Sequence, residues 1–385
     1  MFDVDGLNQV RQDIRNAAER DKRLLEQLRE EVRSLAADVR TIRARSTTAV
    51  SLVASDGGNN QLRFDPFYIQ LIRVVDSYGK ELLRSAVSLM ADTDVVSLEQ
   101  FHADGNPKTV LGQMMADLGT SKLNEVSHMI PSGEECRTHP ERLSTSWLLT
   151  YRDLCEWAVL YDRICRSTFG TDTLLVRDGP LRTKIFRGEL FIKLRDRFNE
   201  AIQRHMRDDR RKVMLVGVIK HSRVIQRYQL AMMIENLFSP GEARYVRIPT
   251  ALEAKAYRWE EWARGEGESG SQGEAPKFKA GVLHLVRFGP HSGDPVWAVD
   301  IFSPQIGQAP EILGYLLADA IDGFPVPYYP RCLQKAHEHA EVVDWDLQIL
   351  QDEIFEAIRR LVPTDRQTVL DAFRMNPDPS AARYE

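Results

Sequence analysis

The chain has 385 residues, of which 43% are hydrophobic and 28% are charged, and its net charge is −5. This composition is typical of a soluble globular protein with a sizeable core, and the acidic balance argues against a uniformly basic, histone-like binder. No apolar run reaches the roughly 18 residues that span a bilayer, and the charged N-terminal segment lacks the apolar stretch of a secretory signal. Four scattered cysteines are typical of reduced thiols, so we expect a cytoplasmic protein without a membrane segment.

Residues 1–45 predict one long N-terminal helix. Apolar or small residues recur at steps of three and four, with Asp21 at one of these positions: Leu7, Val10, Ile14, Ala17, Leu24, Leu28, Val32, Leu35, Val39 and Ile42. Charged residues fill most other positions and no proline interrupts the pattern. This periodicity predicts a coiled coil or helical hairpin that serves dimerisation or partner docking. A helix packed back on its own domain fits the same pattern.

A larger domain at residues 46–363 and a C-terminal helix and tail at 364–385 follow. Its first half predicts strands at 50–56, 61–64 and 67–75, with the first two paired across a turn at 57–60; helices at 80–90, 96–102 and 107–128; a loop at 131–140; a helix at 144–168; and a strand at 173–177. The second half of the domain predicts a helix at 189–206, a buried strand at 213–219, a helix at 222–236, a flexible loop at 264–278, a hairpin of strands 282–288 and 296–302, and helices at 309–321 and 331–361. After the domain, a last helix at 364–374 begins the C-terminal segment.

The order of these elements predicts the fold class. Antiparallel strands come first, and strands alternating with helices, which favour parallel pairing, come later. This order is that of an α/β protein with a ribonuclease-H-like mixed central sheet flanked by helices. In such a sheet the first and fourth strands lie side by side at the centre.

Two aspartates stand at the ends of those two strands. Asp56 and Asp178 each follow a run of strand-forming residues and each precede a glycine. A single Asp-Gly after a strand is more often a turn, but two on adjacent strands would bring two carboxylates together. Because such carboxylates repel each other unless a proton or cation lies between them, we expect a divalent metal there.

A glutamate on the preceding helix is a third candidate ligand. Glu156 lies among apolar residues on the helix at 144–168 and one turn beyond Arg152. The spacing fits an i, i+4 ion pair with Arg152, and it fits equally an inward carboxylate that shares a metal with the aspartates.

Cationic residues follow the aspartates along the chain. Lys220 ends the apolar strand 213–219, where it either marks the strand end or faces a phosphodiester. Residues 182–212 contain eleven Lys and Arg against five Asp and Glu. This stretch fits a solvated, salt-bridged helix face and a phosphate-tracking surface equally well.

Two histidines begin the helix at 331–361. His337 and His339 are two residues apart, so they point to different sides of a helix and do not form a joint zinc site. Near carboxylates, one of them could ligate a metal or carry a proton. The sequence contains no Walker A loop, Rossmann glycine fingerprint, nucleophile elbow or His-Glu-x-x-His motif, so any ATP-driven step would belong to a partner.

Taken in order, these motifs resemble those of the NurA nuclease family over about residues 50–345. The matching segments are Asp56-Gly57-Gly58; the helix with Arg152 and Glu156; Arg177-Asp178-Gly179-Pro180-Leu181; Gly217-Val218-Ile219-Lys220; and Tyr329-Pro330 with Leu333, Ala336 and His337. The chain departs from the family at Pro180, where a small residue is usual, and in its longer N-terminal helix.

The resemblance implies a DNA nuclease that needs manganese or magnesium, with 5′-to-3′ exonuclease and single-strand endonuclease activity. It implies that Asp56, Glu156, Asp178 and His337 bind the metal and that Lys220 faces the phosphate, in a two-metal mechanism. It also implies a homodimer that docks on the hexameric HerA helicase-translocase, in DNA end processing or in defence against invading DNA. Two alternatives stay open: a non-catalytic coiled-coil adaptor that regulates a partner ATPase, and a nuclease for structured DNA or RNA.

Overall fold

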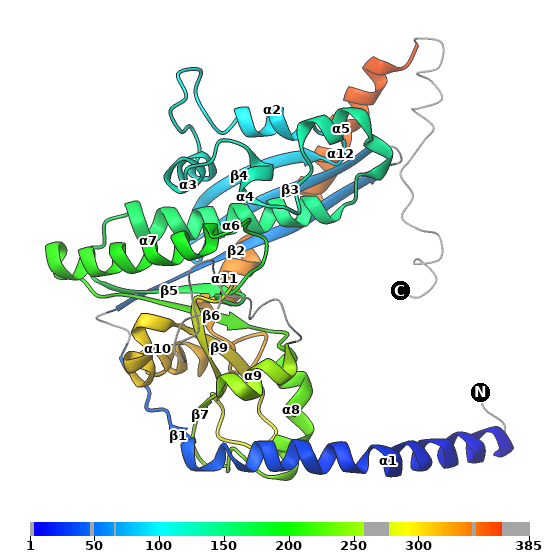
Figure 1. Cartoon of the computed structure of the whole chain (residues 1–385), viewed down its shortest axis with the longest axis vertical. Coiled ribbons are helices and arrows are strands. Elements are labelled where there is room, and N and C mark those ends of the chain that lie inside the picture. Colours follow the sequence, from blue (N-terminus) through cyan, green and yellow to red (C-terminus); the bar gives the residue numbers. More distant parts are fainter. Residues whose placement is uncertain (1–3, 47–49, 65–66, 258–276, 341–343, 364–385) are drawn as a thin grey trace.

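A computed structural model describes residues 4–46, 50–64, 67–257, 277–340 and 344–363, with the backbone alone for residues 4, 5, 50, 51, 55–64, 67, 344–348, 350 and 351. Nine strands of these residues form one sheet, shown in Figure 1. In spatial order they are β1 (Arg40–Thr41), β7 (Arg244–Arg247), β8 (Gly281–Arg287), β9 (Val296–Phe302), β6 (Val213–Ile219), β5 (Asp172–Asp178), β2 (Val50–Phe64), β3 (Phe67–Asp76) and β4 (Glu81–Ser88).

The centre of this sheet has the predicted ribonuclease-H-like arrangement. Strands β2, β5 and β6 are parallel; β3 pairs antiparallel with β2, and β4 pairs antiparallel with β3. The order β4-β3-β2-β5-β6 places the first and fourth long strands side by side, as the sequence predicts. On the far side of β6 the antiparallel strands β9, β8, β7 and β1 extend the sheet. The fold class predicted from the sequence is therefore confirmed.

Helices cover both faces of the sheet. On one face α3 (Val110–Leu118), α6 (Ser146–Arg166) and α7 (Leu190–Arg204) pack over the parallel half, and α8 (Arg223–Ile234) and α9 (Thr250–Ala256) pack over the antiparallel half. On the other face lie α10 (Ala309–Ala320) and α11 (Arg331–Ala340). Neighbouring residues of β5 show the two faces, because Leu175 belongs to the α6 core and Val176 to the α10–α11 core.

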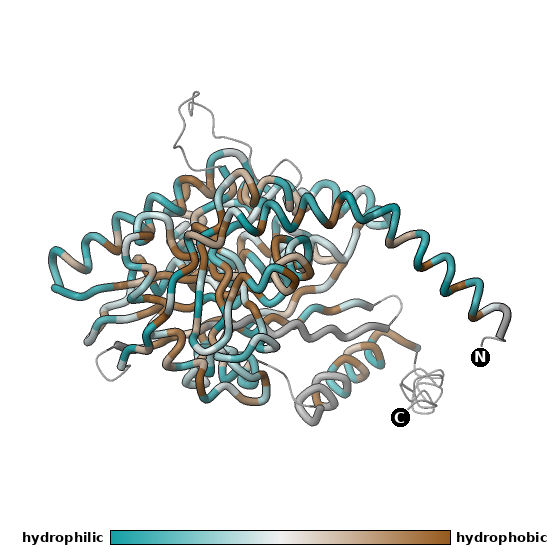
Figure 2. Tube along the Cα trace, turned by 90° about the horizontal axis from the view of Figure 1, so that it is seen from below, coloured by the Kyte–Doolittle hydropathy of each residue, from teal (hydrophilic) through white to brown (hydrophobic). Residues whose placement is uncertain are grey.

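The N-terminal helix is shorter than the sequence predicts. Helix α1 (Val4–Arg33) ends twelve residues before the predicted end at 45, because Leu35 and Ile42 are buried in the body of the protein instead of continuing a helical seam. Its C-terminal part packs on α8, where Arg29 and Arg33 both bind Glu235. Its N-terminal part extends beyond the body (Figure 1) and is mostly hydrophilic along its trace (Figure 2).

Two predicted elements near the first aspartate are wrong. The segment 57–60 is not a turn, because β2 is one continuous strand whose pairing with β3 runs from Ser55 through Phe64. Residues 80–90 are not a helix but contain β4, which pairs with β3. Locally, Gly-Gly-Asn-Asn favours a turn and the helix formers of β4 favour a helix. In both places pairing with β3 overrides this local preference.

The remaining elements differ from the prediction mainly at their ends. The helix expected at 107–128 is divided into α3 and α4 (Leu123–Val126), because α3 ends at Gly119, which has φ +81°. A short helix, α5 (Gly133–Thr138), occupies the expected loop, α2 (Thr93–Leu98) lies near its predicted place, and β7 and α9 were not predicted. The helix expected at 331–361 is described as α11 and α12 (Asp344–Leu361). Most of the predicted loop 264–278 and all of the tail 364–385 lie outside the described residues.

Two further expectations concern the whole chain. Within the described ranges, none of the helices combines the length and the apolar character that crossing a membrane requires. The four cysteines are free thiols, three of them buried, in agreement with the expected reduced state.

Candidate active site at the ends of β5 and β6

Asp178 is the last residue of β5, at the edge where the parallel strands β5 and β6 end. The neighbouring strand β2 does not end there as predicted after Asp56, but continues to Phe64. The strand before Asp178 is buried, which fixes the position of its backbone. In the register, Ser55 of β2 pairs with Arg177, and Asp178 pairs with Val218 of β6. Asp56 therefore occupies the backbone position on β2 that follows the partner of Arg177, beside that of Asp178. The side chain of Asp56 lies outside the described part of the chain.

The carboxylate of Asp178 has a cation and a hydroxyl as partners. Lys220, which follows β6, donates from Nζ to Oδ2 at 2.6 Å. The hydroxyl of Tyr329 donates to Oδ1 at 3.3 Å. The ring of Tyr329 also lies 5.2 Å from the Lys220 ammonium and 4.8 Å from the ring of Trp297. The predicted cation Lys220 is thus brought together with Asp178, next to the buried ring of Tyr329.

Tyr329 is a site residue that the sequence reasoning did not assign. Its side chain is 2% exposed, and it reaches Asp178 from the segment before α11, about 150 residues away in the chain. The sequence signal that could have indicated this role is the Tyr329-Pro330 motif, eight residues before His337. A tyrosine hydroxyl can donate a hydrogen bond to a carboxylate.

The backbone leaves β5 sharply after Asp178. Gly179 has φ +125°, a conformation that side-chain-bearing residues rarely adopt, and its N–H donates to the carbonyl of Val218 at 2.8 Å. The glycine after the aspartate therefore makes the turn that the sequence predicts at this strand end. The corresponding glycine after Asp56 does not, because β2 continues there.

Glu156 of α6 lies among guanidinium groups. Its Oε1 is 3.4 Å from Nε of Arg152, which is the i, i+4 ion pair considered from the sequence, and its Oε2 is 3.4 Å from Arg177. Arg177 precedes Asp178 on β5, so the two side chains leave opposite faces of the sheet. A metal shared by Glu156 and Asp178 would have to lie beyond the strand end that separates the two faces. The role of Glu156 as a ligand stays a prediction.

The other contacts of Arg177 make this a structural cluster. The side chain of Arg177 is 7% exposed, and its guanidinium donates to Asp153 at 2.6 Å and to the carbonyl of Pro180 at 2.7 Å. It also lies 4.4 Å from the ring of Trp157. A buried arginine held by carboxylates, a carbonyl and a ring is the usual arrangement for compensating a buried charge.

The two histidines lie on α11, which packs against β2, β3 and β5. His337 is exposed, and the ring of His339 lies against Gly79 at the turn between β3 and β4. Helix α11 is thus on the same face of the sheet as Asp178. The assignment of His337 as a ligand or proton carrier stays a prediction.

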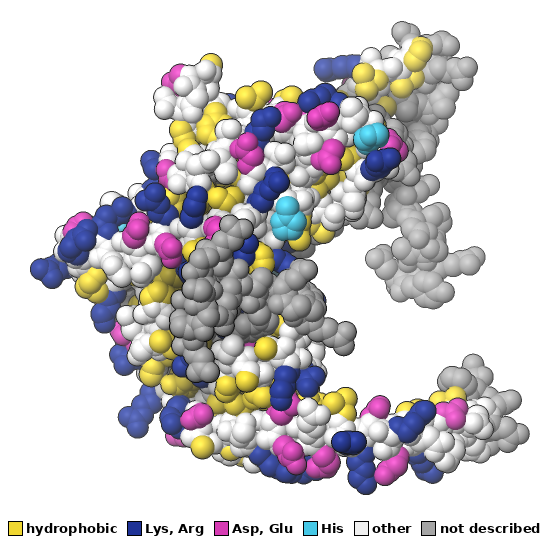
Figure 3. Space-filling view, viewed as in Figure 1, with side chains coloured by type: hydrophobic (Ala, Val, Ile, Leu, Met, Phe, Trp, Pro, Cys, Tyr) yellow, Lys and Arg dark blue, Asp and Glu magenta, His cyan; other side chains and the backbone are white. Residues whose placement is uncertain are grey.

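The basic stretch 182–212 consists of residues with different environments. Arg197 and Arg207 pair with neighbouring acids on the surface, at 3.6 and 2.7 Å, and Arg182 is buried. Figure 3 shows basic and acidic side chains interspersed over α6 and α7. These pairs favour the salt-bridged face over the phosphate-tracking surface for this part of the chain.

The donor set at Asp178 fits a hard divalent cation. The Asp178 carboxylate supplies oxygen ligands, and its ion pair with Lys220 shows that it accommodates a positive charge, which a metal would replace. Among the described side chains, which include Asp178 but not Asp56, no three His, Cys, Asp or Glu form a group that could hold a metal.

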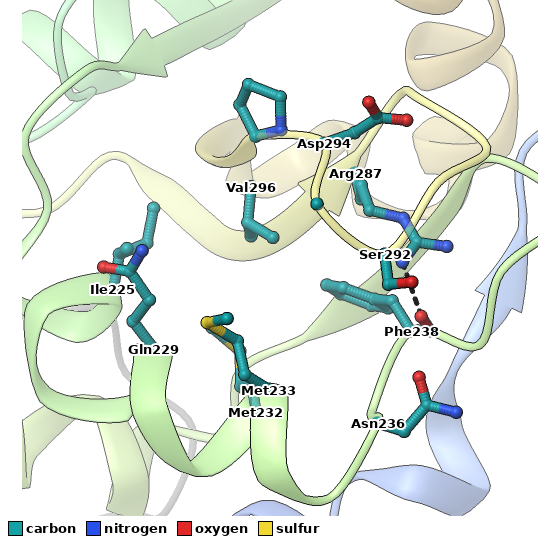
Figure 4. A pocket seen from close by; sticks show the side chains of 12 residues that line it. Ile225, Gln229, Met232, Met233, Asn236, Phe238, Arg287, Ser292, Asp294 and Val296 are labelled. Carbon is teal, nitrogen blue, oxygen red and sulfur yellow. Dashed lines mark hydrogen bonds between the residues drawn. The ribbon is translucent and has the colours of Figure 1, made fainter.

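A pocket of about 270 Å³ lies elsewhere, between α8 and the connection from β8 to β9 (Figure 4). Apolar side chains such as Met232, Met233 and Val296 line it, together with Arg287. Arg287 donates to the carbonyls of Gly289 and Ser239, at 3.2 and 2.7 Å, which joins the two loops around the pocket. None of the predicted site residues lines this pocket, so we do not assign the chemistry to it.

Comparison with known proteins gives matches among solved structures alone. No family model matches the sequence, and no curated protein matches it. The NurA nuclease from Sulfolobus solfataricus is similar at 13% identity and a TM-score of 0.45, over 94% of this chain and 98% of that chain. A structure of NurA with manganese is similar at 12% identity and a TM-score of 0.41, over 91% and 98%. A structure of NurA bound to dAMP and manganese is similar at 13% identity and a TM-score of 0.34, over 98% of both chains.

These structures belong to the family that the sequence resembles. At such identities and TM-scores the likeness concerns the overall fold, and it assigns no activity to this chain. What the chain itself establishes is the class: an α/β protein with a ribonuclease-H-like sheet and an aspartate–lysine–tyrosine cluster at the ends of its parallel strands.

Proposed function

We propose that this protein is a metal-dependent nuclease that hydrolyses phosphodiester bonds in DNA. The observation that carries the proposal is the position of Asp178. It ends a buried central strand, beside the backbone position of Asp56, with Lys220 and Tyr329 on its carboxylate. Two acidic positions on adjacent parallel strands, together with a cation, suit a reaction in which negative charge must be both held and neutralised.

In this proposal Asp56 and Asp178 hold manganese or magnesium, with Glu156 and His337 as further ligands. Bound there, the metal would lower the pKa of a bound water and neutralise charge on the phosphate. The residues of the chain orient and neutralise the reacting groups. Lys220 is suited to leave Asp178 and pair with a phosphate oxygen, because its side chain is 37% exposed. Tyr329 keeps the Asp178 carboxylate in place during that exchange.

The finer assignment follows the sequence resemblance. We propose single-stranded DNA as the substrate, with 5′-to-3′ exonuclease and endonuclease activity, and a homodimer that works with a HerA-type hexameric ATPase in end processing or in defence against invading DNA. RNA or structured DNA is the competing substrate class. The mixed charge of the surface over α6 and α7 does not favour one nucleic acid over another.

A coiled-coil adaptor is the second candidate function. Helix α1 favours it, because Leu7, Val10, Ile14 and Leu24 are between 36% and 63% exposed along its length. The exposed residues keep the spacing of three and four that coiled coils use. An adaptor of this kind would need none of the contacts around Asp178.

Cleavage of an end-labelled single strand by the purified full chain tests the proposal. We expect cleavage with manganese and none with EDTA, and unlabelled DNA should compete better than RNA. If neither labelled DNA nor labelled RNA is cleaved with any divalent metal, with or without a HerA-type ATPase, the nuclease proposal is wrong and the adaptor is favoured.

A further inference from the structure

Four charged side chains form a buried network close to the strand end that carries Asp178. The guanidinium of Arg182 binds Asp300 of β9 and Glu253 of α9, with 2.9 Å between its Nε and Oδ2 of Asp300. Lys279 donates to the other oxygen of Glu253 at 2.7 Å. All four residues are less than 10% exposed, and the two carboxylates are completely buried. The network contains two positive and two negative charges, so it is neutral as a whole.

Burial of such a charged network costs free energy compared with apolar side chains in the same place. Removal of charges from water costs several kcal/mol for each ion, and apolar residues of similar size often give equal or greater stability. Burial lowers the pKa of Lys279, against the opposing effect of Glu253. For Arg182 the effect of burial is outweighed by Asp300 and Glu253, so its pKa is raised. The two cations and two carboxylates lie at hydrogen-bond distance from one another, and this geometry points to a role beyond packing.

One end of the network holds the segment that follows Asp178. The N–H of Leu181 donates to Oδ2 of Asp300 at 3.1 Å, and the next residue is Arg182 itself. The carbonyl of Leu181 accepts from the N–H of Ala280 at 2.8 Å. Asp300 thus fixes the backbone three residues after Asp178 through both a direct hydrogen bond and an ion pair.

The same segment lies flat on the sheet because the strand beneath it has no side chain there. A Cβ added to Gly217 of β6 would be 2.4 Å from the carbonyl oxygen of Gly179, which is too close for any residue but glycine. Gly217 pairs in the sheet with Asp300 of β9. Asp300 and Gly217 are therefore neighbours in the sheet that position the same segment, 179–182. Gly217 leaves space for its backbone, and the Asp300 carboxylate accepts its hydrogen bond from Leu181.

At the other end of the network, the carboxylate of Glu253 has no described hydrogen bond to the backbone of the segment 179–182. The described contacts of the Glu253 carboxylate are with the side chains of Arg182 and Lys279. Glu253 and Asp300 are equally buried and both bind Arg182, but of the two only Asp300 accepts the Leu181 N–H in the described structure. This difference separates a positioning role from a purely structural one.

We propose that Asp300 is a positioning residue for Asp178. By holding Leu181 and Arg182 it fixes the turn that leaves β5, and it thereby keeps the Asp178 carboxylate against Lys220 and toward a bound metal. The inference rests on the proposed nuclease function for its catalytic readout. Its geometric claim, that Asp300 sets the position of Asp178, stands apart from that function.

The test compares Asp300→Ala and Asp300→Asn with Glu253→Gln in the full chain. Removal of the Asp300 carboxylate should lower kcat per folded molecule about 100-fold and weaken manganese binding about 10- to 100-fold, since small displacements of catalytic groups and loss of supporting contacts have effects of this size. Asp300→Asn keeps an oxygen for the Leu181 N–H and should lie between Asp300→Ala and wild type. Glu253→Gln should lower thermal stability to a similar degree and change kcat less than about threefold.

Three measurements keep the outcomes distinct. Electron paramagnetic resonance gives manganese affinity without activity, cleavage gives kcat, and crystal structures give the distance between Lys220 Nζ and Asp178 Oδ2. A wild-type distance in Asp300→Ala, or an equal loss of kcat in Glu253→Gln, would show that the network is structural only. If Asp300→Ala does not fold, Asp300→Asn carries the same comparison. If the wild type cleaves no nucleic acid, the proposed function is wrong, and the crystal structures alone still decide whether Asp300 positions Asp178.

Discussion

Arg177 and Asp178 are adjacent residues of β5, yet they lie in different kinds of charged surroundings. On the α6 face, Arg177 is held by Asp153, Glu156, a backbone carbonyl and the ring of Trp157, all fixed parts of the fold. On the α11 face, the carboxylate of Asp178 is balanced by Lys220, whose side chain is 37% exposed. A charge that is enclosed by fixed partners contributes to the fold, whereas a charge paired with an exposed ammonium can exchange that partner for another cation.

The largest effect is expected for Asp178→Asn. The amide keeps the size of the side chain and can still accept from Tyr329, but it loses the charge that would bind a metal. We expect cleavage to fall by roughly 10³-fold or more, about 4 kcal/mol of transition-state stabilisation, with little change in the melting temperature. A time course with end-labelled DNA measures the loss. Cleavage near the wild-type rate would remove Asp178 from the mechanism.

On the opposite face, Arg177→Met should act on stability more than on chemistry. The substitution leaves Asp153 and Glu156 without their buried cation, which costs about 3–5 kcal/mol for a fully buried pair and about 2–3 kcal/mol here, because the side chain of Asp153 is 27% exposed. Urea unfolding gives the change in free energy. If Arg177→Met stayed as stable as wild type but lost cleavage, the Arg177 cluster would act on the chemistry instead of the fold, and the contrast between the faces would fail.

Lys220→Met separates two roles of the ammonium. Loss of a cation that faces the phosphate should lower cleavage about 10- to 100-fold. Because the ammonium competes for the Asp178 carboxylate, manganese should bind this variant at least as tightly as it binds wild type. Parallel titration and cleavage assays measure both. Weaker manganese binding in Lys220→Met would mean that the lysine supports the site in another way.

A smaller effect is expected for Tyr329→Phe. The ring keeps its contacts with Trp297 and the Lys220 ammonium, and only the 3.3 Å hydrogen bond to Asp178 is lost. A hydrogen bond to a charged group contributes about 1.5 kcal/mol, so we expect cleavage to fall about 10-fold at most. Steady-state kinetics should show the change in kcat. A loss as large as that of Asp178→Asn would indicate that the hydroxyl itself takes part in the chemistry.

The smallest effect on cleavage is expected for Glu31→Gln. This substitution shows what loss of a carboxylate does when the carboxylate stabilises the fold and lies outside the candidate site. Burial raises the pKa of Glu31, but hydrogen bonds from Lys255, Tyr228 and Gln27 outweigh it and lower the pKa from 4.5 to about 2. A lowered pKa means that the carboxylate stabilises the fold above about pH 4.5 and loses this contribution as the pH falls toward 2. Acid unfolding should therefore be less pH-dependent in Glu31→Gln, and cleavage at neutral pH should equal that of wild type. An altered cleavage rate would mean that α1 influences the site.

The sequence predicted the centre of the sheet better than its margins. Strand β6 is almost wholly apolar and β5 has an apolar centre at residues 174–176, patterns that favour buried strands, and both strands have nearly the predicted ends. In β2 the Gly-Gly-Asn-Asn run favours a turn locally, but pairing with β3 extends through it. Strand β4 contains helix formers and is held in the sheet by β3, which no local pattern reveals.

At the candidate site, the sequence could predict only those neighbours that follow from the pairing of adjacent strands. Asp178 and Lys220 end neighbouring parallel strands, so their proximity follows from the predicted order of strands. Tyr329 reaches Asp178 from a distant segment, and Arg182 and Asp300 meet through a turn and an antiparallel strand. Such long-range contacts depend on tertiary packing. The same limit explains why the surroundings of Glu156 could not be decided between Arg152 and the interior.

Manganese binding to wild type, Asp56→Asn, Asp178→Asn and the double variant tests the central claim most directly. The account predicts that each single substitution weakens binding strongly and that the double variant is little worse than either one, since both carboxylates would hold the same ion. Wild-type affinity in Asp56→Asn, or fully additive losses in the double variant, would contradict a metal site shared by Asp56 of β2 and Asp178 of β5.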